Sequence, residues 1–401
     1  MPKIPVWAIM AFTSSAVVVG RLVPIDELER TINLDVILFL IGMFSIVAVA
    51  ESSGLLEALS IVFLSYVKTV HQAIVVLAVT LGILAAVAVN DTVAVMGPPI
   101  AYFVSRALRL QPKVLYLLLA FSITVGSVAT PLGNPQNMLI AIESGMSAPF
   151  IYFLLYLLLP TLINLPLTAL LLLRLYRVKD RPVRVLVVPW EKIRERRDAL
   201  IAAASLVTVI AALLVNDVLS LLGYPHVEHR GFIPFVVAAA SYIAVSNPRD
   251  VVNRIDWSTI LFFITLFVTA EGIWNSGLVE RVLSLFLPSP ERGLEGYASI
   301  TFLSLLLSQA ISNVPFAKLF TEYMHHIGYA PTDVREWLTL AMASTIAGNL
   351  TLLGAASNII ILERLEKDYK QTIGFLEFAR VGLVVTILNV MVYTPFLLLV
   401  R

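Results

Sequence analysis

The sequence predicts an all-α, polytopic membrane protein, built as an inverted-topology repeat with two re-entrant hairpins and two broken helices. Three observations support this fold class: an apolar composition, an internal repeat and four polar breaks. Of the 401 residues, 59% are hydrophobic and 14% are charged, whereas soluble domains average about 25% charged residues. Apolar runs near the roughly 20 residues that cross a bilayer recur along the chain, at 5–23, 34–53, 113–141, 149–173, 198–222, 257–276 and 374–400.

The composition also excludes several classes of function. The net charge of +1 gives no indication of a nucleic-acid partner. The absence of cysteine excludes disulfides, thiolate metal sites and thiol nucleophiles. No Walker-type phosphate loop, His–Glu metal motif or Gly-x-Ser-x-Gly turn occurs, so we expect neither ATP hydrolysis nor an enzyme. The expected partners are the lipid bilayer and a small solute, with no cofactor other than a coupling ion.

The two halves of the chain are related by an internal repeat. Shifting the sequence along itself places Ser53-Gly-Leu-Leu-Glu57 over Ser276-Gly-Leu-Val-Glu280 and, in the same register, Asn90 over Asn313. A slightly smaller shift aligns 130–137 with 351–358, which share Thr-x-Leu-Gly-x-x-x-Asn. Internal repeats of this kind are typical of secondary transporters. We therefore expect one transmembrane domain over 1–401, divided into repeat one (about 1–176), a cytoplasmic linker (177–197), a linking helix (198–222) and repeat two (about 231–401).

Loop charges predict the orientation of the two halves. Residues 174–197 contain nine basic and three acidic residues, which is typical of a cytoplasmic loop. The ends of segment 71–110 are basic, whereas those of the matching segment 298–327 are mainly acidic. Matching segments with opposite flanking charge predict inverted topology. We expect a multi-pass protein of the plasma membrane, with its N-terminus in the cytoplasm and its C-terminus outside.

Each half contains one polar break in a hairpin, at 90–92 or 312–315, and one in a long crossing, at 126–137 or 347–358. Non-helical backbone at membrane depth is tolerated only where protein or water satisfies it. New helix N-termini there attract anions, and freed carbonyls suit cations. The alternative is that these residues only kink helices or link them by hydrogen bonds. Repeat-related positions favour a binding cavity, with the predicted substrate- or ion-binding residues Asn90, Asp91, Thr92, Thr130, Gly133, Asn134, Asn137, Ser312, Asn313, Asn349, Thr351, Gly354, Ser357 and Asn358.

Asp91 is the predicted proton carrier. A carboxylate at the centre of a spanning helix costs about 2.5–3.5 kcal/mol and usually serves ion or proton traffic, and burial disfavours its charged form. The alternative is that Asp91 caps a helix that begins near Thr92. Lys318, one turn past the second hairpin tip, either approaches Asp91 or the substrate, or extends outward to the membrane surface.

Other polar residues carry weaker signals. We expect Glu271 to be interfacial and the loop pair His226 and His229 to be solvated, since a metal site would need further ligands. Asn216 and Asp217 have no counterpart in the repeat.

The four motifs together resemble the ion transporter superfamily, which includes divalent-anion/sodium symporters, citrate transporters, arsenite permeases and D-type sodium/proton antiporters. The hairpin stretch Asn90 to Ala101 is similar to the Ser-Asn-Thr hairpin tip of the dicarboxylate members, and Ser312 to Pro315 to its second copy. The resemblance implies a midplane site formed by hairpin tips and unwound loops, and elevator-type movement of that unit against a scaffold. It also implies a homodimer, for which the sequence carries no interface signal.

The chain departs from the dicarboxylate pattern at both tips, with Asp at 91 and Val-Pro at 314–315. The Asn-Asp and Asn-x-Pro tips look more like the arsenite permease and sodium/proton antiporter branch. We therefore expect a proton-coupled secondary transporter of a small inorganic oxyanion, such as arsenite or antimonite. The alternatives are a sodium/proton antiporter and a sodium-coupled citrate-like transporter. No resident metal is expected, and sodium as coupling ion would bind at Asn90, Asn137, Asn313 and Asn358.

Overall fold

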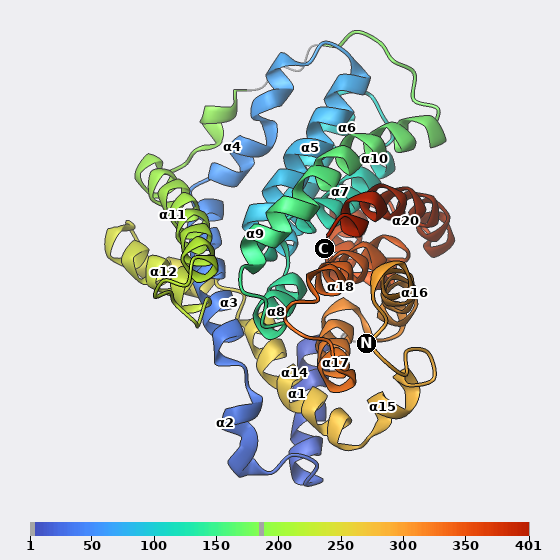
Figure 1. Cartoon of the computed structure of the whole chain (residues 1–401). Helices are drawn as coiled ribbons and strands as arrows, with labels where there is room; N and C mark the ends of the chain where they lie inside the picture. The colour runs from blue at the N-terminus through green and yellow to red at the C-terminus, as the bar shows by residue number, and fades with distance from the viewer. Residues whose placement is uncertain (1–4, 184–187, 401) are drawn as a thin grey trace.

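The computed structural model describes residues 5–183 and 188–400, and these ranges contain helices and one isolated β-bridge but no β-strand (Figure 1). The first half comprises α1 (Val6–Val19), α2 (Leu28–Thr31), α3 (Leu34–Ser52), α4 (Leu55–Ile61), α5 (Val70–Ala88), α6 (Asn90–Ala107), α7 (Pro112–Ser127), α8 (Pro135–Glu143), α9 (Pro149–Phe153) and α10 (Leu159–Leu175). The second half comprises α11 (Arg196–Leu221), α12 (Phe232–Ala244), α13 (Pro248–Arg254), α14 (Trp257–Asn275), α15 (Leu278–Leu283), α16 (Gly293–Ile311), α17 (Asn313–Ile327), α18 (Val334–Ile346), α19 (Ala356–Tyr369) and α20 (Phe375–Leu398).

Among the described residues, seven helices are long and apolar enough to cross a bilayer: α3, α5, the continuous helix 149–175, α11, α14, α16 and α20. The predicted class, a polytopic all-α membrane protein, is therefore confirmed. Individual spans differ from the apolar runs. Residues 5–23 form only the 14-residue α1, and the run 113–141 is divided between α7 and α8 because its centre is unwound.

The internal repeat is visible in the backbone. Helix α3 is followed by Gly54 and α4, just as α14 is followed by Gly277 and α15, and both glycines are left-handed, with φ of 80° and 71°. Each hairpin turns at a single residue that is not glycine but has a positive φ. This residue is Val89 (φ 63°) between α5 and α6 and Ser312 (φ 69°) between α16 and α17. Such a conformation is uncommon outside glycine. Its occurrence at two positions that the sequence repeat aligns shows that the two hairpins are copies of one unit.

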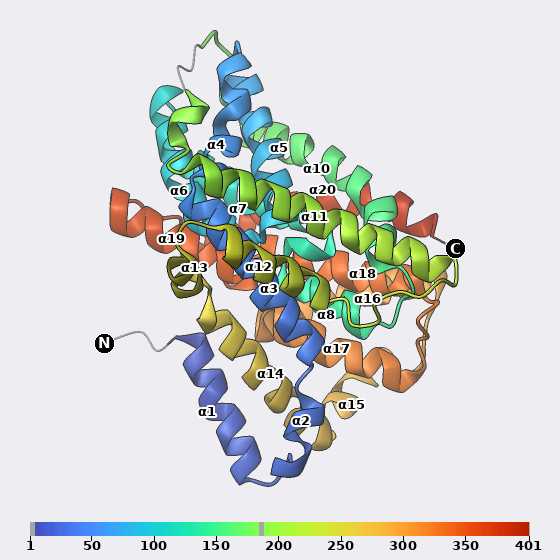
Figure 2. The ribbon, with the colours of Figure 1, turned by 90° about the vertical axis from the view of Figure 1, so that its left-hand side faces the viewer.

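The two repeats are interlocked through their first helices. Helix α1 packs on α14 of the second half, and α12 packs on α3 of the first, as Figure 2 shows. A Cβ atom added at Gly272 would lie 2.3 Å from Val17 Cγ1, and one added at Gly42 would lie 2.5 Å from the backbone of Phe235. Glycine thus permits the close approach at both crossings.

One long helix lies between the two halves of the chain. The linking helix α11 spans Arg196–Leu221, against the predicted 198–222, and lies with α12 at one edge of the molecule next to α3 (Figure 1). Residues 184–187 of the predicted cytoplasmic linker lie outside the described residues.

Candidate functional site

Two broken helices form the centre of the candidate site. In the first, α7 and α8 are separated by an unwound segment that contains the short 3-10 turn η3 (Pro131–Gly133), and in the second α18 and α19 are separated by η6 (Ala347–Asn349) and η7 (Leu352–Gly354). An asparagine closes each unwound segment. The Nδ2 atom of Asn137 donates to the carbonyl oxygens of Ser127 (3.0 Å) and Thr130 (3.5 Å), while that of Asn358 donates to those of Gly348 (2.7 Å) and Thr351 (3.3 Å). These equivalent bonds satisfy carbonyls that the interrupted helices leave free.

The threonine that precedes each 3-10 turn binds the first limb of its hairpin. Thr130 donates to the carbonyl oxygen of Ala86 on α5, and Thr351 donates to Oε1 of Gln309 on α16 at 2.7 Å. Gln309 in turn donates to the carbonyl oxygen of Ala347 at 2.8 Å. The shift that places Asn90 over Asn313 also places Ala86 over Gln309. Each broken helix is therefore fixed to its own hairpin at an equivalent point.

The two broken helices meet each other at Thr345, in the last turn of α18. Its hydroxyl donates to Asn137 Oδ1 at 3.0 Å and accepts from Nδ2 of Asn134 at 3.2 Å and from Nε2 of Gln136 at 3.0 Å. The segment that precedes the second break therefore holds the first break in place.

The second hairpin tip lies at the same point. A Cβ atom added at Gly348 would be 3.4 Å from Asn313 Nδ2 at the tip and 3.5 Å from Thr124 Cγ2 on α7. Three of the four predicted breaks are thus brought together, and the first hairpin tip, at Asn90, is tied to them through the Thr130 bond to Ala86, one turn before it.

Several buried polar atoms of the predicted site have no hydrogen-bond partner among the residues that the structure describes. They include the amide oxygens of Asn90, Asn313, Asn349 and Asn358 and the hydroxyl of Ser357. Buried acceptors without a donor are uncommon in folded proteins. Amide oxygens are suitable ligands for hard cations, so the oxygens of Asn313, Asn349 and Asn358 in the second half, and that of Asn90 in the first, are free to accept one. The oxygen of Asn137 is different, because Thr345 already occupies it.

Asp91 lies in the first turn of α6, and α6 begins at Asn90 with no side-chain cap. The capping role considered for Asp91 is therefore not observed. Asp91 is partly exposed. Within the described ranges, no hydrogen bond or ion pair involves its side chain. The charge that acts on it is that of Asp256, at the start of α14. A negative charge in the first turn of a helix is stabilised by the helix dipole.

Lys318 neither approaches Asp91 nor extends outward. It is buried, and its Nζ atom lies 2.9 and 3.0 Å from the two carboxylate oxygens of Glu143 and 2.9 Å from Glu322. Glu143 is the last residue of α8, which packs against α17. The sequence separation of 175 residues between Lys318 and Glu143 hid this contact from sequence reasoning.

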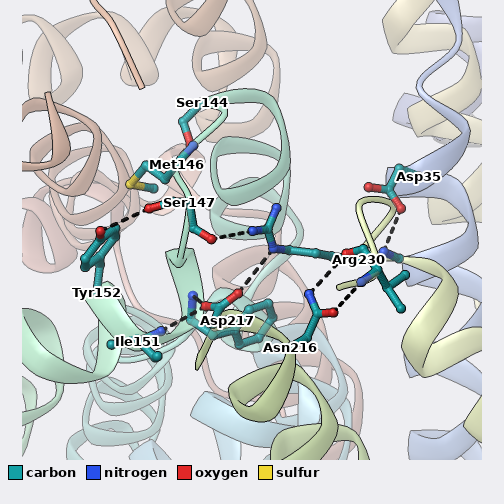
Figure 3. Close-up of polar contacts among 12 residues, drawn as sticks. Asp35, Ser144, Met146, Ser147, Ile151, Tyr152, Asn216, Asp217 and Arg230 are labelled. Atoms are coloured by element: carbon teal, nitrogen blue, oxygen red, sulfur yellow. Dashed lines mark hydrogen bonds and ion pairs between the residues drawn. The ribbon is translucent and has the colours of Figure 1, made fainter. Parts of the chain in front are cut away.

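Asp217 has a structural role that the repeat comparison did not reveal (Figure 3). Its Oδ2 atom accepts from the backbone N–H groups of Phe150 (2.7 Å) and Ile151 (3.2 Å), at the start of α9. Its Oδ1 atom lies 3.2 Å from Nε of Arg230, which also donates to the carbonyl oxygen of Ser147. Asp217 thus fixes the linking helix α11 to α9, outside the candidate site.

The remaining polar residues have ordinary surroundings. His226 and His229 are exposed and Glu271 is partly exposed. In the described part of the chain, no three His, Cys, Asp or Glu side chains are grouped as metal ligands would be.

Comparisons with known proteins agree with this architecture. An uncharacterised transporter of Mycobacterium tuberculosis (strain ATCC 25618 / H37Rv) is 27% identical, over 90% of this chain and 85% of its own length. A silicon efflux transporter of Oryza sativa subsp. japonica is 30% identical, over 69% of this chain and 67% of its own. A putative transporter arsB of Dictyostelium discoideum is 33% identical over 45% of this chain and 32% of its own.

The fold matches a crystal structure of the YdaH transporter of Alcanivorax borkumensis, described as having an unusual topology. The TM-score is 0.59 at 15% sequence identity, over 93% of this chain and 86% of that one. The family model described as "Citrate transporter" matches residues 1–347. The chain therefore belongs to the citrate transporter family, a family of secondary transporters.

Proposed function

We propose that this secondary transporter exports a small inorganic oxyanion or its neutral acid, such as arsenite or antimonite, in exchange for protons. The observation that supports this proposal best is the meeting of the two broken helices at Thr345 and Asn137, with the second hairpin tip at Gly348. The names of two relatives point to the same substrate class, since one is a silicon efflux transporter and the other is arsB-like. We place the protein in the plasma membrane, with a cytoplasmic N-terminus.

The start of α19 is the proposed position of the oxyanion. The N-cap residue Ala355 provides no side-chain hydrogen bond, whereas at the start of α8 the side chain of Asn134 accepts from the N–H of Asn137 at 2.8 Å. The dipole of α19 and the hydroxyl of Ser357, which has no partner among the described residues, are therefore available to bind an anion. The Nδ2 atom of Asn313, next to Gly348, supplies a further donor from the hairpin.

Asp91 is the proposed proton carrier. Its carboxylate is not committed to a hydrogen bond or ion pair within the described residues, so that a proton can bind and leave without breaking a structural contact. Movement of α5–α8 and α16–α19 as one unit, here called the transport unit, would expose Asp91 and the oxyanion alternately to the two sides of the membrane.

The test is flux in proteoliposomes that contain the purified protein. We expect arsenite to move against its gradient when a proton gradient is imposed, and Asp91→Asn to abolish this proton-driven component. Asp250→Asn is the matched control, because the side chain of Asp250 is 45% exposed and pairs, among the described residues, with Arg254 one turn along its own helix. Proton-driven flux of the Asp91→Asn protein equal to that of the wild type would disprove the proposal.

Sodium coupling is a second candidate, supported by the unpartnered oxygens of Asn90, Asn313 and Asn358. In the same liposomes, a sodium gradient in place of the proton gradient distinguishes the two ions. Citrate in place of arsenite tests the citrate-like alternative.

A further inference from the structure

A second group of charged residues lies away from Asp91, where α8 and α17 meet. Lys318 and Glu322 are one turn apart on α17, and Glu143 ends α8. All three side chains are largely buried, with 10%, 19% and 11% of their area exposed. Lys318 Nζ lies within 3.0 Å of both carboxylates, and 5.3 Å above the ring centre of Phe267 on α14. The group therefore lies at the boundary between the transport unit and α14.

The charges in this group do not balance. One ammonium faces the two carboxylates of Glu143 and Glu322, which leaves a net negative charge in a buried place. Glu271 on α14 adds a further negative charge that acts on Glu322. A buried net charge is costly unless it is compensated, and one proton would remove it.

The other elements packed against α17 carry charged groups with other surroundings. On α15, Glu280 lies 3.7 Å from His326, and Arg281 is exposed. On α18, Arg335 donates to the carbonyl oxygen of Val400, and Glu336 accepts from the N–H of Gly293. The charged residue of α16 is Glu295, which is exposed in its first turn. His325 of α17 contacts the backbone oxygen of Glu143, and its ring packs on Trp337.

The two carboxylates have different surroundings, which indicates where a proton would bind. Both oxygens of Glu143 accept from Lys318, and Oε1 also accepts from Asn33 at 3.3 Å. Hydrogen bonds of this kind favour the charged form of a carboxylate. Glu322 is bound to Lys318 through Oε1, while its Oε2 atom is buried with no partner among the described residues. That oxygen is the free position for a proton.

We propose that Glu322, held beside Lys318 and Glu143, is a second proton-binding site, distinct from Asp91. The proton comes from water and adds to Oε2, so that Glu143 and Lys318 remain as a neutral ion pair and no covalent bond is broken. A role for this proton in transport rests on the proposed function, but the binding of the proton does not.

Infrared difference spectroscopy of the purified protein in lipid, between alkaline and acidic pH, tests the proposal without any transport assay. The wild type is expected to gain the C=O band of a buried carboxylic acid on acidification. Glu322→Gln should lose the contribution of Glu322 to this band, while Asp91→Asn and the exposed control Glu280→Gln should retain that contribution. Lys318→Met should retain the band to higher pH, since the cation that favours the charged carboxylates is removed.

A band in Glu322→Gln that equals the wild-type band in intensity and pH dependence would overturn the proposal. If Glu322→Gln does not yield folded protein, Glu143→Gln serves in its place. Lys318 is then shared with one carboxylate only, so the remaining acid band should appear at lower pH than in the wild type. An unchanged band would again contradict the site. Proton-driven flux retained in Asp91→Asn would contradict the proposed function alone, and an unchanged band in Glu322→Gln would contradict the second proton site alone, so the two ideas fail independently.

Discussion

The hydroxyl of Thr345 in the second repeat donates to the side-chain oxygen of Asn137 in the first, at 3.0 Å. The same hydroxyl accepts from Asn134 and Gln136, so a single buried side chain connects the last turn of α18 with the start of α8. These hydrogen bonds favour joint movement of the two broken helices, which the proposed transport unit needs.

Replacing Thr345 by valine should therefore destabilise the protein. The change keeps the shape of the side chain but leaves Asn137 Oδ1 without a donor, at an expected cost of about 1–2 kcal/mol. The control is Thr339→Val, because the hydroxyl of Thr339 donates to the carbonyl oxygen of Arg335 within its own helix. Thermal unfolding in detergent, followed by tryptophan fluorescence, should show a larger loss for Thr345→Val. Equal losses would mean that the contact between the repeats contributes nothing.

The sequence predicted the parts of the fold that depend on the repeat. The alignment of Asn90 with Asn313 also relates the left-handed turns at Val89 and Ser312, each of which directly precedes its asparagine. Breaks were predictable because glycine, proline and asparagine in an apolar run are incompatible with an unbroken membrane helix.

Contacts between the repeats were not predictable, because they follow from how the two copies pack and not from the residues of either copy. Thr345 and Gln309 gave no signal, since threonine and glutamine are tolerated in membrane helices for many reasons. The pairing of Lys318 with Glu143 and the capping of α9 by Asp217 join segments 175 and 67 residues apart. The predicted binding roles of the site residues stay predictions.

Replacing Gly126 by alanine should disrupt the contact between α5 and α7. A Cβ atom at this position would lie 2.1 Å from the backbone oxygen of Gly82, a distance that only backbone displacement relieves. Overpacking of this kind costs about 1–3 kcal/mol. Gly374→Ala is the control, since a Cβ atom there meets nothing within 4 Å. The measurement is the unfolding temperature of both variants, and a Gly126→Ala protein as stable as Gly374→Ala would contradict the close approach.

The ion pair between Arg292 and Asp333 should make stability depend on pH. Nε and one terminal nitrogen of Arg292 lie 2.7 and 2.9 Å from the two oxygens of Asp333. These hydrogen bonds hold the pKa of Asp333, in the loop before α18, below its ordinary value of 3.8. Because the pKa is lowered on folding, the stabilisation is present above pH 3.8 and is lost as the pH falls through the lower, folded value.

Asp333→Asn should therefore lower the unfolding temperature at pH 6, and its difference from the wild type should shrink below pH 4. The control is Asp250→Asn. The carboxylate of Asp250 forms a solvent-accessible pair with Arg254, so its replacement should change the free energy of unfolding by no more than about 0.5 kcal/mol. A difference between Asp333→Asn and wild type that stays constant from pH 6 to pH 3 would show that the ion pair is not its cause.

The repeat-equivalent residues Asn137 and Asn358 should respond differently to substitution, and the difference tests sodium binding. Both side chains close an unwound segment through Nδ2, so alanine at either position should lower the unfolding temperature. Of these two side-chain oxygens, that of Asn358 is unpartnered among the described residues, whereas that of Asn137 accepts from Thr345.

If sodium is the coupling ion, it stabilises the wild type by binding the folded state. Asn137→Ala should then retain the rise in unfolding temperature on replacing potassium by sodium, and Asn358→Ala should lose it. A sodium-dependent rise retained in Asn358→Ala would exclude its oxygen as a ligand, and no rise in the wild type would leave the proton as the proposed coupling ion.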